Sequence, residues 1–319
     1  MKKKPEISMY YLDGDPFVWQ PKQLRADFEA MRRIGADSVC ISVLESHTSD
    51  YPGKVALARS AGLKVYAIPS RVGGFFAGWP KVASLFAARH PEYLVLTRDG
   101  RFQDATAGSV CCPNQPAFRA WFLEWLEKLL DESGVDGVVY DEPKEAHVPC
   151  WCPACRKLCP DQDEAARVRF REASVAGLLG EACRLVKRSR PDRTNILFVM
   201  PDATGHFKTR ILEQPELDYF GNDGPVCHQG EPEQTHQKTS LFDSVPAIFR
   251  LADQAGKKRF TLVETFSIHS GAMAELARNL PRVAEWQADL YAFYFYGTGN
   301  QEPERVMELS AEAIARIKG

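Results

Sequence analysis

Residues 134–155 read GVDGVVYDEPKEAHVPCWCPAC. This stretch passes from a helix-ending glycine through a short apolar strand to two consecutive carboxylates, Asp141 and Glu142, and then to three cysteines at CxCxxC spacing. An apolar strand that ends on acidic residues is typical of α/β folds, whose sites lie at the carboxyl ends of their strands. The stretch therefore predicts both an α/β fold and the place of its functional site.

Seven further apolar runs have the character of strands, and helices or helix-bearing loops separate them. The predicted strands span residues 7–12, 38–44, 63–69, 135–140, 194–200, 217–220, 259–263 and 290–296. The clearest helix, 116–130, repeats large apolar residues at helical spacing, which indicates a core-facing stripe. Short strands that alternate with helices predict a single (β/α)8 TIM barrel over residues 1–319.

The main competitor is a doubly wound sheet, which would carry a glycine-rich GxGxxG turn after the first strand. The sequence DGD at residues 13–15 is not such a turn. At 319 residues and 45% hydrophobic, the chain is long enough to bury one large core. The barrel would carry two loop insertions, an extended one at 73–112 after the third strand and a cysteine-rich one at 143–162 after the fourth.

Composition limits the classes of partner. Lys and Arg number 40 against 42 Asp and Glu, a formal charge of −2, so nothing favours nucleic acid and a neutral substrate is expected. No segment approaches the ~20 apolar residues of a membrane span, and the basic start lacks the apolar run of a signal peptide. We expect a cytoplasmic protein, and the sequence is compatible with a homo-oligomer. Its nine cysteines are expected to be thiols or metal ligands and not disulfides.

Polar residues follow nearly every predicted strand, and the carboxyl ends of barrel strands share one mouth. Two aromatic residues, Trp151 and Tyr296, are candidate platforms on which a sugar ring stacks. The expected substrate-binding residues are Asp13, Glu45, His47, Arg71, Asp141, Trp151, Asp202, His206, Asn222, Asp223 and Tyr296.

Two glutamates end opposite strands of this barrel. Glu142 follows the fourth strand and Glu264 the seventh, so the two carboxyl groups would face each other across the mouth. Glycoside hydrolysis needs such a pair, about 5 Å apart for retention and roughly 6.5–9.5 Å apart for inversion. The alternative is that these strand-end carboxylates are merely hydrated, or paired with Arg71 and Lys144.

This layout resembles that of the clan A retaining glycosidases, in which a Glu after strand four is the acid/base and a Glu after strand seven the nucleophile. The resemblance implies that Glu142 is the acid/base and Glu264 the nucleophile. In one respect the chain departs from the clan, which usually carries Asn where Asp141 stands. An additional negative charge at Asp141 is expected to raise the pKa of Glu142.

Cys150, Cys152 and Cys155 offer three soft ligands, and tetrahedral zinc takes four. Cys112, in the segment CPN at 112–114, is the preferred fourth, with Cys111 and Cys159 as competitors. The two segments resemble those that hold zinc in the family-42 β-galactosidases and their uncharacterised barrel relatives. The resemblance covers the barrel only and implies a structural zinc on the preferred four.

The sequence as a whole favours a retaining glycoside hydrolase that acts on a small carbohydrate or glycoside. One alternative is a carbohydrate-binding or catalytically degenerate barrel. Another is a lyase or epimerase that uses Glu142 or Glu264 as a base, with His206 or His228 as its partner.

Overall fold

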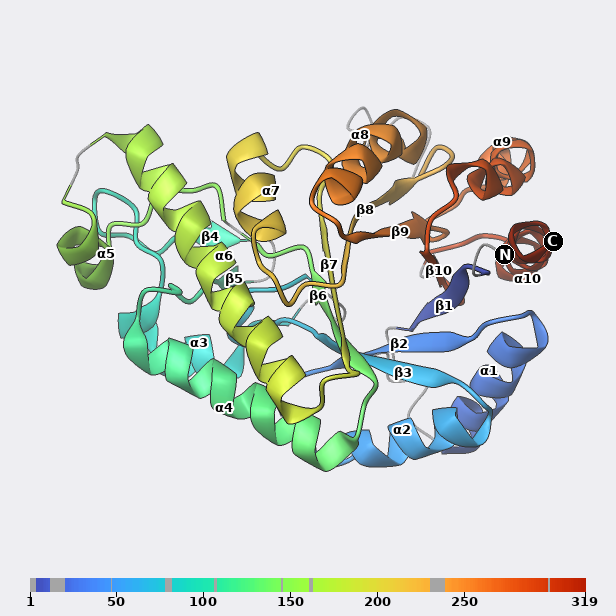
Figure 1. Ribbon diagram of the computed structural model, residues 1–319, viewed down its shortest axis with the longest axis horizontal. Coiled ribbons are helices and arrows are strands. Elements are labelled where there is room, and N and C mark those ends of the chain that lie inside the picture. The colour runs from blue at the N-terminus through green and yellow to red at the C-terminus, as the bar shows by residue number, and fades with distance from the viewer. Residues whose placement is uncertain are drawn as a thin grey trace.

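Eight parallel strands close into a barrel in the order β1-β10-β9-β8-β7-β6-β3-β2 (Figure 1). The computed structural model describes residues 4–11, 21–46, 48–77, 82–105, 108–144, 146–160, 163–229, 239–297 and 299–319. The barrel strands are β1 (Glu6–Tyr11), β2 (Ser38–Val43), β3 (Lys64–Pro69), β6 (Gly137–Asp141), β7 (Thr194–Val199), β8 (Tyr219–Pro225), β9 (Lys258–Glu264) and β10 (Leu290–Tyr294). Each overlaps a predicted strand, although β8 shares only residues 219–220 with its prediction, so the predicted (β/α)8 barrel is confirmed.

Helices surround the barrel. They are α1 (Pro21–Arg33), α2 (Tyr51–Ser60), α3 (Leu85–Arg89), α4 (Pro116–Ser133), α5 (Pro153–Leu158), α6 (Glu164–Ser189), α7 (Gly205–Leu212), α8 (Leu241–Gln254), α9 (Met273–Asn279) and α10 (Pro303–Lys318). Helices α4 and α6 lie side by side (Figure 1), joined by an ion pair of 2.7 Å between Arg119 and Glu181. No helix among the described residues is long and apolar enough to cross a membrane.

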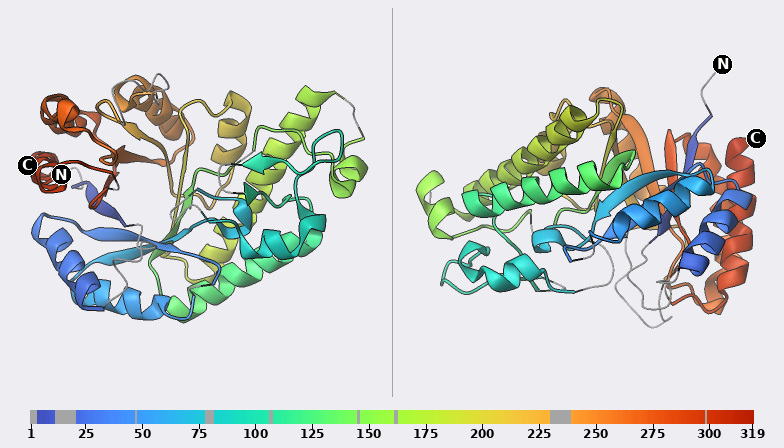
Figure 2. Two further views of the ribbon diagram at one scale, coloured as in Figure 1. Left: turned by 180° about the vertical axis from the view of Figure 1, so that it is seen from behind. Right: turned by 90° about the horizontal axis from the view of Figure 1, so that it is seen from below.

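Both predicted insertions carry short elements of their own. The segment after β3 holds the 3-10 turns Val72–Gly74 and Pro91–Tyr93, helix α3, and a small antiparallel pair, β4 (Asp104–Ala105) and β5 (Gly108–Ser109). The segment after β6 holds α5, which lies at the end of the molecule away from the two termini (Figure 2). At that other end, the Lys4 ammonium donates to the Lys318 carbonyl over 2.9 Å.

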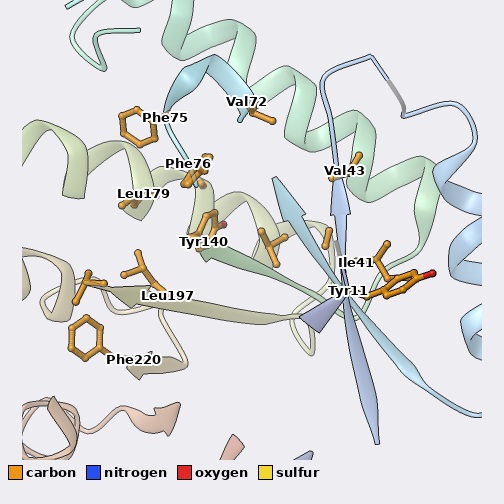
Figure 3. Packing of buried hydrophobic residues seen from close by; sticks show 14 of the residues in the cluster. Tyr11, Ile41, Val43, Val72, Phe75, Phe76, Tyr140, Leu179, Leu197 and Phe220 are labelled. Atoms are coloured by element: carbon orange, nitrogen blue, oxygen red, sulfur yellow. The ribbon is translucent and has the colours of Figure 1, made fainter. Parts of the chain in front are cut away.

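Side chains alternate between the inside and the outside of the barrel because successive residues of a strand point to opposite faces. Tyr140, Leu197 and Phe220 are paired in register on β6, β7 and β8, and Figure 3 shows them on the outer face, toward Leu179 of α6. Val139 belongs to the separate apolar cluster that fills the interior. This alternation decides which strand-end residues can reach the mouth.

Candidate active site and thiolate cluster

Four carboxylates converge at the carboxyl ends of β6, β8 and β9. Asp141, Glu142, Asp223 and Glu264 are all buried, between 1% and 8% exposed. Each of them raises the pKa of the Tyr294 phenol on β10, after burial, which is the largest cause. One phenol therefore lies within the field of all four carboxylates, a convergence that the sequence predicted for the acids but not for the tyrosine.

The local backbone explains how Asp141, the last residue of β6, and Glu142, the residue after it, both turn toward the mouth. Asp141 shares the inward phase of Val139, so a regular strand would turn Glu142 outward. The φ angle of Glu142 is instead +36°, a left-handed conformation that is uncommon outside glycine. Backbone strain of this kind gathers at functional sites, where surrounding contacts hold it.

Glu142 has a proton affinity suited to acid and base chemistry at neutral pH. Its pKa is raised to about 7, by burial first and by the charge of Asp223 second, while the charge of Lys144 opposes the rise. The Lys144 ammonium lies 2.5 Å from Glu142 Oε2. Sequence reasoning expected Asp141 to raise this pKa, but the carboxylate that does so is Asp223, from two strands away. The alternative interpretation expected Glu142 to pair with Lys144. That contact is present, but the pKa of Glu142 is nevertheless raised.

Asp141 is tied to the opposite wall of the barrel. The Tyr10 hydroxyl, from β1, donates to Asp141 Oδ2 over 2.5 Å, and the backbone N–H of Ala77 donates to the Asp141 carbonyl over 2.9 Å. The charge of Asp141 also acts on Arg71, whose pKa is lowered by burial and partly restored by that carboxylate. Asp141 and Arg71 are therefore close enough for their charges to interact, and Tyr10 is a further contact of Asp141.

Glu45 has a different role from the one expected. Its Oε1 accepts from the Gly73 N–H over 2.7 Å and from the Ser84 hydroxyl over 2.5 Å, and its Oε2 accepts from the Phe86 N–H over 2.9 Å. Three protein donors thus occupy the carboxylate. Glu45 braces the insertion after β3 and caps the start of α3, so the prediction that it binds substrate is corrected.

The two predicted aromatic platforms differ in exposure. Trp151 is only 3% exposed, and the guanidinium groups of Arg167 and Arg98 lie 3.8 and 5.2 Å from its ring centroid. A ring covered in this way is not a platform for a sugar, which corrects that prediction. Tyr296 is 50% exposed, has a left-handed φ of +47° and packs against Phe295, so it keeps a free surface.

Two other predicted residues point toward helices. His206 Nδ1 lies 2.6 Å from Glu172 Oε2, which joins α7 to α6. The Asn222 amide donates over 2.8 Å to the Ser244 hydroxyl on α8, outside the barrel. These contacts engage both side chains with helices, and their predicted role in binding substrate stays a prediction. Asp202 lies exposed in the turn after β7, and Asp13 and His47 are outside the described residues.

Four cysteine sulfurs form a compact group beside α6. The Sγ atoms of Cys112, Cys150, Cys152 and Cys155 all lie within 4.8 Å of one another, and the four side chains are buried. Cys112 Sγ is 3.4 Å from that of Cys155 and 3.7 Å from that of Cys150. Zinc–sulfur bonds of about 2.3 Å in a tetrahedron place the sulfurs roughly 3.8 Å apart, so this group fits one ion.

The same geometry distinguishes Cys112 from the two competing cysteines. Cys111 and Cys159 stand outside the group of four, although both are free thiols. The Cys111 N–H donates to the Gly73 carbonyl over 2.9 Å, in the insertion after β3. Of the three cysteines that the sequence left open, the structure brings Cys112 to the cluster.

No family model and no curated protein matches this chain. Solved structures do match its fold. An α-L-fucosidase isoenzyme 2 from Paenibacillus thiaminolyticus has a TM-score of 0.68 at 13% identity, over 98% of this chain and 49% of that one. A β-galactosidase from the psychrophilic Marinomonas ef1 has a TM-score of 0.71 at 12% identity, over 97% and 59%.

An endo-β-1,4-mannanase from Thermotoga petrophila has a TM-score of 0.58 at 11% identity, over 99% of this chain and 77% of that one. The chain thus spans about half the length of the fucosidase and 59% of the β-galactosidase. The expected likeness to (β/α)8-barrel glycosidases is confirmed as a likeness of fold.

Proposed function

We propose that this protein is a glycoside hydrolase in which Glu142 is the acid/base and Glu264 the nucleophile. The observation that carries the proposal is the buried Glu142, whose pKa of about 7 suits proton transfer, in a mouth that also holds Glu264. Both carboxylates act on the Tyr294 phenol, which supports their place in one pocket. The three solved structures of similar fold are a fucosidase, a β-galactosidase and a mannanase, which supports the same class of reaction.

The proposed reaction is retaining and has two steps. Glu142 protonates the leaving oxygen while Glu264 attacks the anomeric carbon, and then Glu142 takes a proton from the water that releases the sugar. The contact with Lys144 holds the Glu142 carboxylate in one orientation. Tyr296, half-exposed, is the proposed stacking platform, and Asp141 and Asp223 are proposed to accept hydrogen bonds from sugar hydroxyls.

The acid/base role of Glu142 predicts a dependence on the leaving group. Changing Glu142→Gln is expected to lower kcat/KM by roughly 10²–10⁴-fold for alkyl glycosides, whose leaving oxygen needs a proton. Activated aryl glycosides should lose far less in their first step. Steady-state rates over a panel of glycosides measure this, with Glu132→Gln, an exposed residue of α4, as the control. Equal rates for Glu142→Gln and wild type on alkyl glycosides would show that the assignment is wrong.

Asp223 and Lys144 shift the pKa of Glu142 in opposite directions, so replacing them should move the pH profile of kcat/KM in opposite directions. The acid must be protonated, so kcat/KM should fall as pH rises through about 7. Asp223→Asn removes the negative neighbour, lowers the pKa of Glu142 and moves this fall to lower pH. Lys144→Met removes the cation, raises the pKa and moves the fall to higher pH. Profiles of kcat/KM that shift in the same direction for both variants would contradict this account.

The contact of His206 argues against the lyase or epimerase alternative. Its Nδ1 lies 2.6 Å from Glu172 Oε2, between α6 and α7, so the ring is already engaged. The carbohydrate-binding alternative is tested by the same panel, because a binding barrel turns over no glycoside. The cytoplasmic location and the compatibility with a homo-oligomer stay predictions from the sequence.

We further propose that the four clustered cysteines hold a structural zinc ion. Four thiolates close the coordination sphere, so the ion would brace the fold and not act on substrate. The segment that it would hold is already tied to the insertion after β3, because the Lys144 N–H donates to the Phe75 carbonyl and the Trp151 N–H to the Leu96 carbonyl, each over 2.8 Å. The same segment carries the Lys144 side chain to Glu142.

A further inference from the structure

One face of α6 lies against the group of four cysteines, Cys112, Cys150, Cys152 and Cys155. Arg167, Arg171 and Ser174 follow one another at i, i+4 and i+7, which places them in one row along the helix. The two arginines are among the largest fully buried side chains, at 1% and 0% exposure. A buried guanidinium is costly unless an anion or acceptors compensate it.

Hydrogen bonds connect this row of side chains to the segment that carries Cys150 and Cys155. Arg167 Nη1 donates to the Cys150 carbonyl over 3.0 Å, and its guanidinium lies 3.8 Å from the ring centroid of Trp151. Arg171 lies between Arg167 and Ser174 in this row and is fully buried. From the other side of the cluster, the Asn114 amide donates to the Ser174 hydroxyl over 3.0 Å and lies 3.3 Å from Cys155 Sγ.

The charges of the two arginines balance those of a cysteine cluster that holds a divalent ion. Four thiolates with one divalent cation would carry a net charge of −2, and two guanidinium groups carry +2, so the loaded cluster and the two arginines together would be neutral. Sulfurs within 4.8 Å of one another leave room for one ion and not for a multinuclear cluster. A trivalent ion would leave an excess positive charge in the core.

We propose that Arg167 and Arg171 are the counter-charge of a single divalent ion on Cys112, Cys150, Cys152 and Cys155, and that they set its affinity. Helix α6 thus belongs to the metal centre although it supplies no ligand. The inference rests on the proposed metal site and is independent of the proposed glycosidase activity. Hydrogen bonds and charges around metal ligands contribute strongly to affinity in other sites.

The first test measures zinc affinity by competition with a chromogenic chelator. Arg171→Met is expected to weaken zinc binding by roughly 10–100-fold. Arg171→Lys keeps the charge and should bind zinc more tightly than Arg171→Met. Arg169→Met, an exposed position on the same helix, is the matched control and should bind as the wild type does. If Arg171→Met does not yield folded protein, Arg171→Gln replaces it, with the same expected loss.

The second test compares melting temperatures with and without zinc. A counter-charge stabilises only the metal-loaded protein, so Arg171→Met should reduce the difference between the two temperatures. A residue that merely packs would lower both equally. The inference is overturned if Arg171→Met binds zinc like the wild type, if Arg171→Lys binds as weakly as Arg171→Met, or if the wild type binds no zinc. None of these measurements uses glycoside turnover, so they test this inference even if the protein is not a glycosidase.

Discussion

Changing Glu264→Gln is expected to lower kcat for aryl glycosides by roughly 10³-fold or more, because the amide cannot attack the anomeric carbon. The substitution preserves size at a position that is 1% exposed at the end of β9. Unlike the effect of Glu142→Gln, this loss should not depend on the leaving group, since the nucleophile is needed for every substrate.

The measurement is the steady-state rate on several aryl glycosides of different leaving-group acidity. Glu285→Gln, exposed in the 3-10 helix Leu280–Trp286, is the control for a neutral amide elsewhere on the surface. A melting temperature close to that of the wild type would verify that the barrel is intact. Wild-type turnover by Glu264→Gln would remove the residue from the mechanism, whatever the result for Glu142.

Changing Cys152→Ser is expected to release the proposed zinc and to lower the melting temperature by about 10 °C or more. Structural zinc sites contribute several kcal/mol to folding, and each kcal/mol moves the midpoint by roughly 2–4 °C in a domain of this class. Elemental analysis should find one zinc per chain in the wild type and little in the variant.

The matched control for this prediction is Cys159→Ser. Cys159 follows α5 in the same segment but stands outside the group of four sulfurs, so its loss should change neither zinc content nor melting temperature. Wild-type protein purified without chelator that contains well under one zinc per chain would contradict the metal site. So would a melting temperature that a strong chelator leaves unchanged.

The barrel was predictable because its signals are local. Each strand is a short apolar run, and polar residues such as Asp141, Asp223 and Glu264 end these runs at the mouth. Tyr10 and Tyr294 were not predicted as site residues, because the sequence pattern of an aromatic residue within a strand is the same whether it fills the core or contacts a carboxylate. Only the closed barrel brings the Tyr10 hydroxyl to Asp141, 131 positions away.

Several predicted site residues make contacts that no local pattern encodes. Glu45 receives its three donors from the insertion after β3, and His206 receives its partner from α6. Trp151 was placed in a loop correctly, but its burial under Arg167 depends on how that loop packs on the helix. Likewise, the sequence left Cys111 and Cys112 as competitors, because neighbouring residues point in different directions and the backbone decides between them.

The central claim is that Glu264 forms a covalent bond with the sugar while Glu142 handles protons. Glu142→Gln should trap this state with an activated aryl glycoside, because the first step needs no acid and the second lacks its base. The decisive measurement is peptide mass spectrometry of the trapped protein. We predict one added glycosyl group on the peptide that contains Glu264. Steady turnover without an adduct, or an adduct on another carboxylate such as Asp223, would contradict the account.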